Sequence, residues 1–135
     1  MKGLSKSSET WGFIHADIHY SNLISTSRGI SFIDFDLSGF GYYALDVASA
    51  ALFTKSELRD DLHSGYTNII SRKIDIAQLE DLMFLEICGL YAFRVSREEM
   101  HMWIREHILS LIELCKSLIK GKMVFYKINQ VGLTN

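Results

Sequence analysis

The stretch that decides the fold of this chain is HADIHYSN, residues 15–22, which places two histidines, an aspartate and an asparagine close together. Polar side chains held in a folded site must each find a partner, so this density indicates a function. Two chemistries fit the motif. His15, Asp17 and His19 alternate along the chain and could converge on zinc in a metal-dependent hydrolase. Alternatively, Asp17 and Asn22 could form a phosphoryl-transfer loop.

A β-hairpin is predicted directly after this motif. The segments Asn22–Thr26 and Ile30–Phe35 are apolar enough to form two short strands, and the turn residues 27–29 separate them. The glycine-containing stretch 37–43 that follows predicts a flexible loop. The hairpin therefore connects the first polar motif to this loop.

A second acidic motif, IDFD at residues 33–36, lies at the exit of the predicted hairpin. Its carboxylates, Asp34 and Asp36, would stand beside the glycine-containing loop. Carboxylate and amide oxygens suit a hard cation such as Mg²⁺, and Asn22 supplies an amide oxygen. A phosphatase with a nucleophilic aspartate would also use an Asp-x-Asp motif, but the alternation of strands and helices expected of that class is missing.

The spacing of the two motifs favours phosphoryl transfer. This reaction needs a carboxylate that orients and deprotonates the attacking hydroxyl, and oxygen ligands that hold a metal ion against the phosphates. Asp17 and Asn22 are five residues apart, and Asp34 follows one hairpin later. In kinases the catalytic base, a metal-binding asparagine and a metal-binding aspartate have this order and spacing.

Two longer stretches make the sequence similar to a known family. GFIHADIHYSNLI and ISFIDFDLSGFGYYALDVASAL, within residues 12–53, resemble the catalytic loop and the metal-binding segment of the aminoglycoside phosphotransferase and choline kinase-like family. This family has a protein-kinase-like fold. The resemblance implies an α+β, mostly α chain that forms the C-terminal lobe of that fold, with a small β-hairpin carrying the catalytic and metal-binding loops and a helical bundle behind it.

The resemblance also implies the roles of the site residues. Asp17 would be the catalytic base, Asn22 and Asp34 metal ligands, and Asp36 a residue close to the metal or the phosphates. Three further residues would support them: His15 would brace the loop, Asp46 would steady it from the start of a helix, and His19 would be either a substrate-side group or an exposed loop residue. The implied cofactors are Mg²⁺ and ATP (or GTP). The acceptor would be a hydroxyl of a small molecule such as an aminoglycoside, a choline-like compound or an amino alcohol.

The family's N-terminal lobe, which carries a phosphate-binding lysine, has no counterpart in the ten residues before Trp11. We therefore expect this chain to match the C-terminal lobe only. Two partners follow from that expectation, a separate N-terminal lobe or a second copy of the chain. The main alternative function is a catalytically incomplete, stand-alone lobe that serves as a binding or assembly module.

The rest of the chain predicts helices. Periodic apolar residues indicate helices at 46–53, 56–70, 75–95 and 96–121. Ser56, Asp75 with Gln78, and Ser96 with Glu99 are candidate N-terminal caps, and Gly121 would end the last helix. The predicted organisation is a flexible lead-in at 1–10, a lobe at 11–122 divided into 11–42 (catalytic and metal-binding) and 43–122 (helical), and a C-terminal tail at 123–135.

Composition narrows the function classes. The formal net charge is -2 and the pI about 6.2, so no nucleic-acid partner is expected. No secretory signal is apparent, and the most apolar stretch, Met83–Val95, is too short to span a bilayer, so we expect a cytoplasmic protein without a membrane partner. Cys88 and Cys115 fall in apolar helical patterns and are predicted to be small buried hydrophobic residues.

Overall fold

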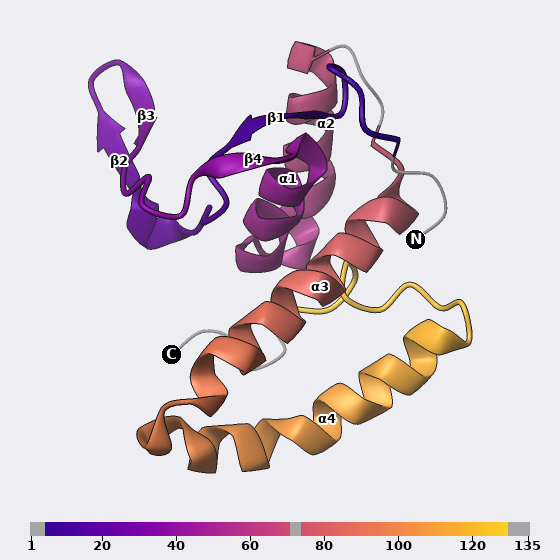
Figure 1. Ribbon diagram of the computed structural model, residues 1–135. Helices are drawn as coiled ribbons and strands as arrows, with labels where there is room; N and C mark the ends of the chain where they lie inside the picture. Colours follow the sequence, from indigo (N-terminus) through magenta and orange to yellow (C-terminus); the bar gives the residue numbers. More distant parts are fainter. Residues whose placement is uncertain (1–4, 71–73, 130–135) are drawn as a thin grey trace.

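The computed structural model describes residues 5–70 and 74–129. Figure 1 shows a mixed α and β chain in which two short strand pairs lead into four helices. The strands are β1 (Trp11–Ile14), β2 (Leu23–Thr26), β3 (Gly29–Phe32) and β4 (Gly39–Tyr42), and the helices are α1 (Tyr43–Phe53), α2 (Arg59–Ile70), α3 (Ile76–Val95) and α4 (His101–Ile119). The α+β, mostly helical class predicted from the sequence is confirmed.

The prediction of a flexible loop at residues 37–43 is wrong. This stretch contains β4, which pairs antiparallel with β1 so that Gly12 lies opposite Gly41. The two glycines permit close packing, because a Cβ on Gly12 would collide with the ring of Tyr43 and a Cβ on Gly41 with the side chain of Ile14. The glycines are therefore needed for the close approach of these side chains to the strand pair.

The predicted hairpin is present as β2 and β3, but both strands are shorter than expected. Asn22 belongs to a 3-10 turn that precedes β2, and β3 ends at Phe32, three residues before Phe35. The second strand stops because Asp34 adopts a left-handed backbone conformation, with φ of 61°, which is incompatible with extended structure. Figure 1 shows this hairpin projecting away from the helices.

Two of the three predicted helix caps are wrong. Asp75 caps α3 as expected, because its side chain accepts a hydrogen bond from the N–H of Ala77. Ser56 is instead the first residue of a 3-10 turn before α2, and no side-chain hydrogen bond caps that turn. Ser96 donates its hydroxyl backwards to the carbonyl oxygen of Phe93, so it ends α3 rather than starting α4. Gly121, with φ of 75°, follows the end of α4 as predicted.

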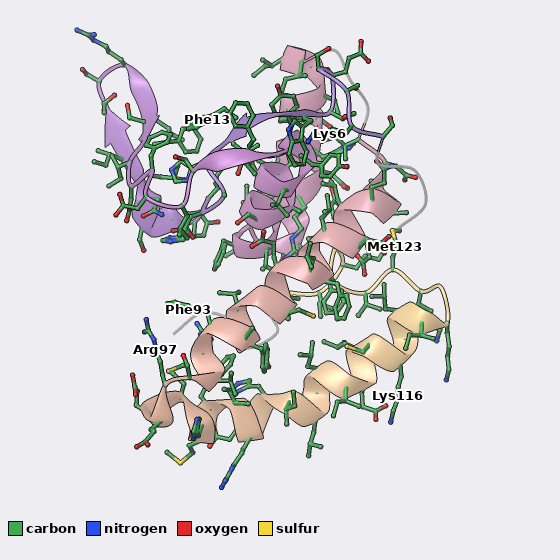
Figure 2. The ribbon with its side chains drawn as sticks, viewed as in Figure 1. Lys6, Phe13, Phe93, Arg97, Lys116 and Met123 are labelled. Carbon is green, nitrogen blue, oxygen red and sulfur yellow. The ribbon has the colours of Figure 1, made fainter. Side chains whose placement is uncertain are left out.

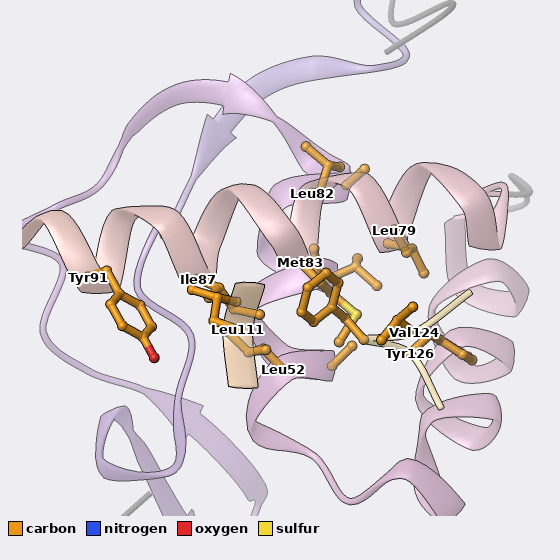
Figure 3. Close-up of a cluster of buried hydrophobic side chains, with 14 residues drawn as sticks. Leu52, Leu79, Leu82, Met83, Ile87, Tyr91, Leu111, Val124 and Tyr126 are labelled. Atoms are coloured by element: carbon orange, nitrogen blue, oxygen red, sulfur yellow. The ribbon is translucent and has the colours of Figure 1, made fainter. Parts of the chain in front are cut away.

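The core lies between α1 and α3, which pack along much of their length (Figure 3). Its fully buried members come mainly from these two helices, with Leu111 from α4. The labelled core residues are Leu52, Leu79, Leu82, Met83, Ile87, Tyr91, Leu111, Val124 and Tyr126. Burial of such side chains contributes about 1.5–3 kcal/mol each to folding.

The segment that the sequence assigns to a tail contributes to this core. Phe125 is almost completely buried, and its ring stacks on Phe84 of α3 at 5.7 Å. Two buried charged residues hold the segment. Glu80 accepts hydrogen bonds from the backbone N–H groups of residues 124, 125 and 126. The guanidinium of Arg59 donates to the carbonyl oxygens of residues 51, 54, 125, 126 and 128.

The C-terminal half is less covered than its apolar pattern predicts. Leu85 and Phe93 on α3 are exposed, because α1 covers one side of this helix and α4 packs against another. Cys88 is exposed and Cys115 half-buried, so the prediction of two buried cysteines is wrong for Cys88. Within the described residues, no helix is long and apolar enough to cross a membrane.

Candidate functional site

The predicted catalytic loop, residues 15–22, connects β1 to β2 and is closed by Asn22. The buried amide of Asn22 donates hydrogen bonds to the carbonyl oxygen of Asp17 at 3.0 Å and to the Oδ2 atom of Asp17 at 2.9 Å. The five-residue spacing therefore brings the two polar groups into direct contact. The amide nitrogen faces Asp17, which leaves the amide oxygen as the group that can meet a cation.

The acidic segment meets the catalytic loop at Asn22. The backbone N–H of Ile33 donates to the carbonyl oxygen of Asn22 at 3.0 Å, so Asp34 follows the residue that is bonded to Asn22. Asp34 has φ of 61°, a strained conformation that costs an L-residue about 1–2 kcal/mol. Strain of this kind is often found where a side chain is directed toward a binding site.

Helix α1 holds the catalytic loop from the side opposite the hairpin. Asp46 accepts hydrogen bonds from the backbone N–H of His15 at 2.9 Å and from that of Ala16 at 2.8 Å. One turn later the buried hydroxyl of Ser49 donates to the carbonyl oxygen of Ile18 at 3.2 Å. Asp46 lies inside the first turn of α1 and binds the loop instead of capping its own helix.

Sequence reasoning did not identify Ser49. Its three-residue spacing from Asp46 on a predicted helix was the available signal, since residues three apart share a helix face. Ala16 carries a second left-handed backbone, with φ of 63°, directly before Asp17. Both acidic motifs therefore contain one residue in this strained conformation.

His15 is buried beneath the loop and does not join a metal cluster. Its Nε2 atom donates to the carbonyl oxygen of Ile33 at 2.9 Å, since a carbonyl can only accept. Its ring lies 4.5 Å from that of Phe35. Nδ1 is buried and has no hydrogen-bond partner.

His19 lies beside the proposed base. Its Nε2 atom is 3.4 Å from Oδ2 of Asp17 and 3.2 Å from the amide nitrogen of Asn22, and its ring packs on Phe53. His15 and His19 therefore have different neighbours, which argues against the zinc hydrolase. Within residues 5–70 and 74–129, no group of three or more histidine, cysteine, aspartate or glutamate side chains is arranged to hold a metal ion.

Asp36 is placed away from these contacts. It lies in the turn between Phe35 and Ser38, where the N–H and hydroxyl of Ser38 both donate to the carbonyl oxygen of Phe35. The side chain of Asp36 is exposed. Hydrogen bonds thus join Asp17 to Asn22, and Asp46 to the backbone just before Asp17, whereas Asp34 and Asp36 are both exposed.

Glu86 on α3 is a site residue that the sequence did not reveal. Burial, together with the smaller effect of the nearby carboxylates of Asp17 and Asp46, raises the pKa of this carboxyl to about 7. A carboxyl with a perturbed pKa beside a predicted base is a candidate functional group. Glu86 follows the predicted catalytic loop by more than sixty residues, so only the packing of α3 on α1 brings it there.

A comparison with protein-family models shows which family this chain resembles. The model of the phosphotransferase enzyme family matches residues 3–80, more than half of the chain. This chain belongs to the phosphotransferase enzyme family. The resemblance recognised in the two motifs is therefore confirmed. Searches of curated proteins and of solved structures found no match.

The family match extends beyond the two motifs. It begins before β1, includes the catalytic loop, the hairpin, α1 and α2, and ends within α3 at Glu80. Glu86 and all of α4 lie outside the matched range. The phosphotransferase match therefore covers Asp17, Asn22, Asp34 and Asp46 and ends before Glu86.

Proposed function

We propose that this chain carries the catalytic and metal-binding residues of an ATP-dependent (or GTP-dependent) small-molecule kinase. The observation that supports this most is the contact between Asp17 and Asn22, together with the bond from Ile33 that brings Asp34 beside Asn22. Family membership supports phosphotransfer in general. The nucleotide, the metal ion and the acceptor are parts of the proposal.

In this mechanism Asp17 orients the acceptor hydroxyl and accepts its proton. Its Oδ2 atom receives the amide of Asn22, which leaves Oδ1 as the oxygen that meets the hydroxyl. Asp46 and His15 act as positioning residues. Asp46 binds the turn before Asp17 through two backbone N–H groups, and His15 supports the segment leading to Asp34 through the carbonyl of Ile33.

The oxygen donors of the site fit Mg²⁺. This ion usually takes one or two carboxylates and completes its shell with phosphate oxygens and water. The carboxylate of Asp34 and the amide oxygen of Asn22 would hold it, and Asp36 would lie toward the phosphates. When bound, Mg²⁺ offsets the negative charge of the phosphates during transfer.

The acidic surroundings of Asp17 support an acceptor that carries both a hydroxyl and a positive charge. Glu86 is close enough to Asp17 and to Asp46 for their charges to interact. Attraction between these carboxylates and an ammonium group would place a neighbouring hydroxyl near Asp17. Aminoglycosides, choline-like compounds and amino alcohols all have this combination of groups.

The first test is Mg²⁺-dependent ATP binding by the purified chain, measured by calorimetry. We expect saturable binding that Asp34→Asn weakens at least tenfold, because asparagine tolerates the left-handed backbone but lacks the charge. The matched control is Asp61→Asn, an exposed change on α2 that should leave binding unchanged. A folded chain that does not bind Mg²⁺ and ATP would overturn the proposal.

The second test separates binding from chemistry. Asp17→Asn should keep nucleotide binding but remove transfer of the γ-phosphoryl to an acceptor, measured with a panel of amino alcohols and aminoglycosides. Turnover that survives this substitution would exclude Asp17 as the base.

A second candidate function is a stand-alone lobe that binds a partner and transfers nothing. It is favoured by an open apolar surface next to the catalytic loop, formed by side chains of β1, β3, α1 and α2. Nucleotide binding without turnover, for every acceptor tested, would favour this candidate over the kinase.

A further inference from the structure

Helix α1 holds the catalytic loop on both sides of Asp17. Asp46 accepts hydrogen bonds from the backbone N–H groups of residues 15 and 16, directly before Asp17. Ser49, one turn further along α1, donates its hydroxyl to the carbonyl oxygen of Ile18, directly after Asp17. Residues three apart share a helix face, so a single face of α1 binds the backbone before and after this aspartate.

The supporting side chain is buried, whereas the group that it holds is open to solvent. Ser49 is 3% exposed, but the side chain of Asp17 is 35% exposed. Ile18 is only half-buried and borders an open apolar hollow, so packing covers only part of its side chain. The position of Asp17 therefore depends on contacts of the loop backbone more than on burial of side chains.

The backbone next to Asp17 is strained. Figure 2 labels Phe13 on β1, the strand that leads into the loop. Two residues beyond the end of β1, Ala16 adopts a left-handed backbone with φ of 63°. A residue keeps such a conformation only where surrounding contacts hold it. Asp46 binds the strained turn itself, and Ser49 binds the peptide group that follows Asp17.

The hydroxyl of Ser49 connects two distant segments of the chain. A serine inside a helix often donates back to a carbonyl of its own preceding turn. Ser49 donates to a carbonyl 31 residues away in the sequence. Among the described residues, no backbone N–H outside the helices and strands binds this carbonyl. Without the hydroxyl, the partly buried carbonyl would need water as its partner, and the loop would have to move to reach it.

We propose that Ser49 is a positioning residue for Asp17 and acts through the carbonyl of Ile18. This role rests on the proposed kinase function, in which Asp17 must lie within hydrogen-bonding distance of the acceptor hydroxyl. Reaction rates fall steeply when a catalytic group is displaced by about 1 Å. Because Ser49 contacts the loop and not the nucleotide, its loss should slow the chemical step without weakening nucleotide binding.

The first measurement needs no substrate. Amide hydrogen exchange, followed for individual residues by NMR, reports how often the loop opens. Ser49→Ala should speed the exchange of the N–H groups of Ala16 and Asn22, which are bonded within the loop region, by about fivefold. If only a core amide such as that of Ile87 in α3 exchanged faster, Ser49 would support the fold and not the loop, and the proposal would be wrong.

The second measurement is turnover with Mg²⁺, ATP and a panel of amino alcohols and aminoglycosides. Ser49→Ala should lower kcat about tenfold and leave KM for ATP unchanged. Ser49→Cys separates the hydrogen bond from side-chain volume, because a thiol fills the same space but is a weak donor. We expect it to resemble Ser49→Ala in both measurements. A Ser49→Cys variant that behaves like the unmodified chain would overturn the role of the hydrogen bond.

The matched control is Ser117→Ala, the same change at a half-buried position on α4, which should alter neither measurement. Unchanged exchange in the loop of Ser49→Ala would overturn the proposal at any level of activity. An unmodified chain that phosphorylates no acceptor would instead overturn the proposed function. The exchange measurement would then still decide whether Ser49 holds the loop.

Discussion

The catalytic loop and the C-terminal segment 124–128 are held by the same device in different surroundings. In both regions, charged side chains from helices bind backbone groups that no helix or sheet satisfies. Asp46 binds two N–H groups beside an open surface, whereas Arg59 and Glu80 bind N–H and carbonyl groups in the interior, where they are 1% and 2% exposed.

The difference separates function from stability. A buried charge that loses its hydrogen-bond partners cannot bind water instead, so breaking its contacts destabilises the fold. We call Arg59 and Glu80 the C-terminal clamp, because their contacts stabilise the folded position of this segment. The loop held by Asp46 remains accessible, and its order matters for the position of Asp17. Changes in the clamp should therefore affect stability most, and changes around the loop should affect activity most.

The largest effect is expected for Arg59→Met. This change removes the Arg59 donor from five carbonyl oxygens, of which that of Ala51 keeps the N–H of Thr54, and it should lower the free energy of unfolding by about 3–5 kcal/mol. Urea denaturation followed by circular dichroism measures it. Arg97→Met, at an exposed position, should change the value by less than about 0.5 kcal/mol. A small loss for Arg59→Met would contradict the view that the clamp supports the fold.

Glu80→Gln tests the other half of the clamp. Glutamine has nearly the same shape, but its NH₂ group would face backbone N–H groups that the carboxylate now satisfies. We expect a loss of about 2–3 kcal/mol in the same urea experiment. Glu113→Gln, at an exposed position on α4, is the matched control. Equal stability of Glu80→Gln and Glu113→Gln would show that the charge of Glu80 is not needed for the stability of the fold.

Asp46→Asn should lower activity much more than stability, which distinguishes the catalytic loop from the C-terminal clamp. One of the N–H groups of His15 and Ala16 would lose its acceptor, which should cost about 1–2 kcal/mol of stability. If the kinase proposal holds, phosphotransfer should fall about 100-fold, since a displaced base reacts slowly. Asp75→Asn is the control, because asparagine also caps helices well. A variant with normal turnover would remove Asp46 from the positioning role.

Glu86→Gln should increase stability, with a defined pH dependence. The pKa of Glu86 is raised to about 7 in the folded state, above the value of about 4.3 for an unfolded glutamate. The folded state therefore prefers the protonated form, and the carboxylate destabilises it increasingly as the pH rises from about 4 to 7. Glutamine avoids this cost, which is about 3 kcal/mol without solvent screening. Because the side chain is only partly buried, we expect a gain of about 1 kcal/mol at pH 8 and none near pH 4.

Urea titrations of both proteins at the two pH values measure this gain. Glu106→Gln on α4 is the control and should show no such pH dependence. An equal gain in stability for Glu86→Gln at both pH values would mean that ionisation of the Glu86 carboxyl is not the cause of the gain.

The smallest effect is expected for Ala16→Gly. Glycine relieves the left-handed backbone of Ala16 but adds freedom to the unfolded chain, so the net gain should be about 0.5 kcal/mol. Ala92→Gly, in the exposed part of α3, should instead lose about 1 kcal/mol. The two melting temperatures should move in opposite directions. A loss at residue 16 would show that the strain there is compensated by other contacts.

The sequence predicted the local features well. The hairpin, the four helices and the Asp75 cap follow from alternation, periodicity and capping patterns, which depend on neighbouring residues. The spacing of Asp17 and Asn22 predicted a phosphoryl-transfer loop, and the structure brings these two residues into contact. The sequence predictions failed where contacts between distant segments of the chain determine the structure. The pairing of residues 39–42 with β1 and the proximity of Glu86 to Asp17 depend on partners that no local pattern identifies.

The sequence by itself thus determined the family, the order of the polar motifs and the positions of the helices, because these properties are encoded within short segments. The tertiary structure decided which surfaces those segments bury. It placed residues 124–126 in the core, where Arg59 and Glu80 satisfy their backbone groups, and it left open the apolar surface between the hairpin and the first two helices. The physical reason is that burial depends on which elements pack together, and packing is a property of contacts between segments far apart in the chain.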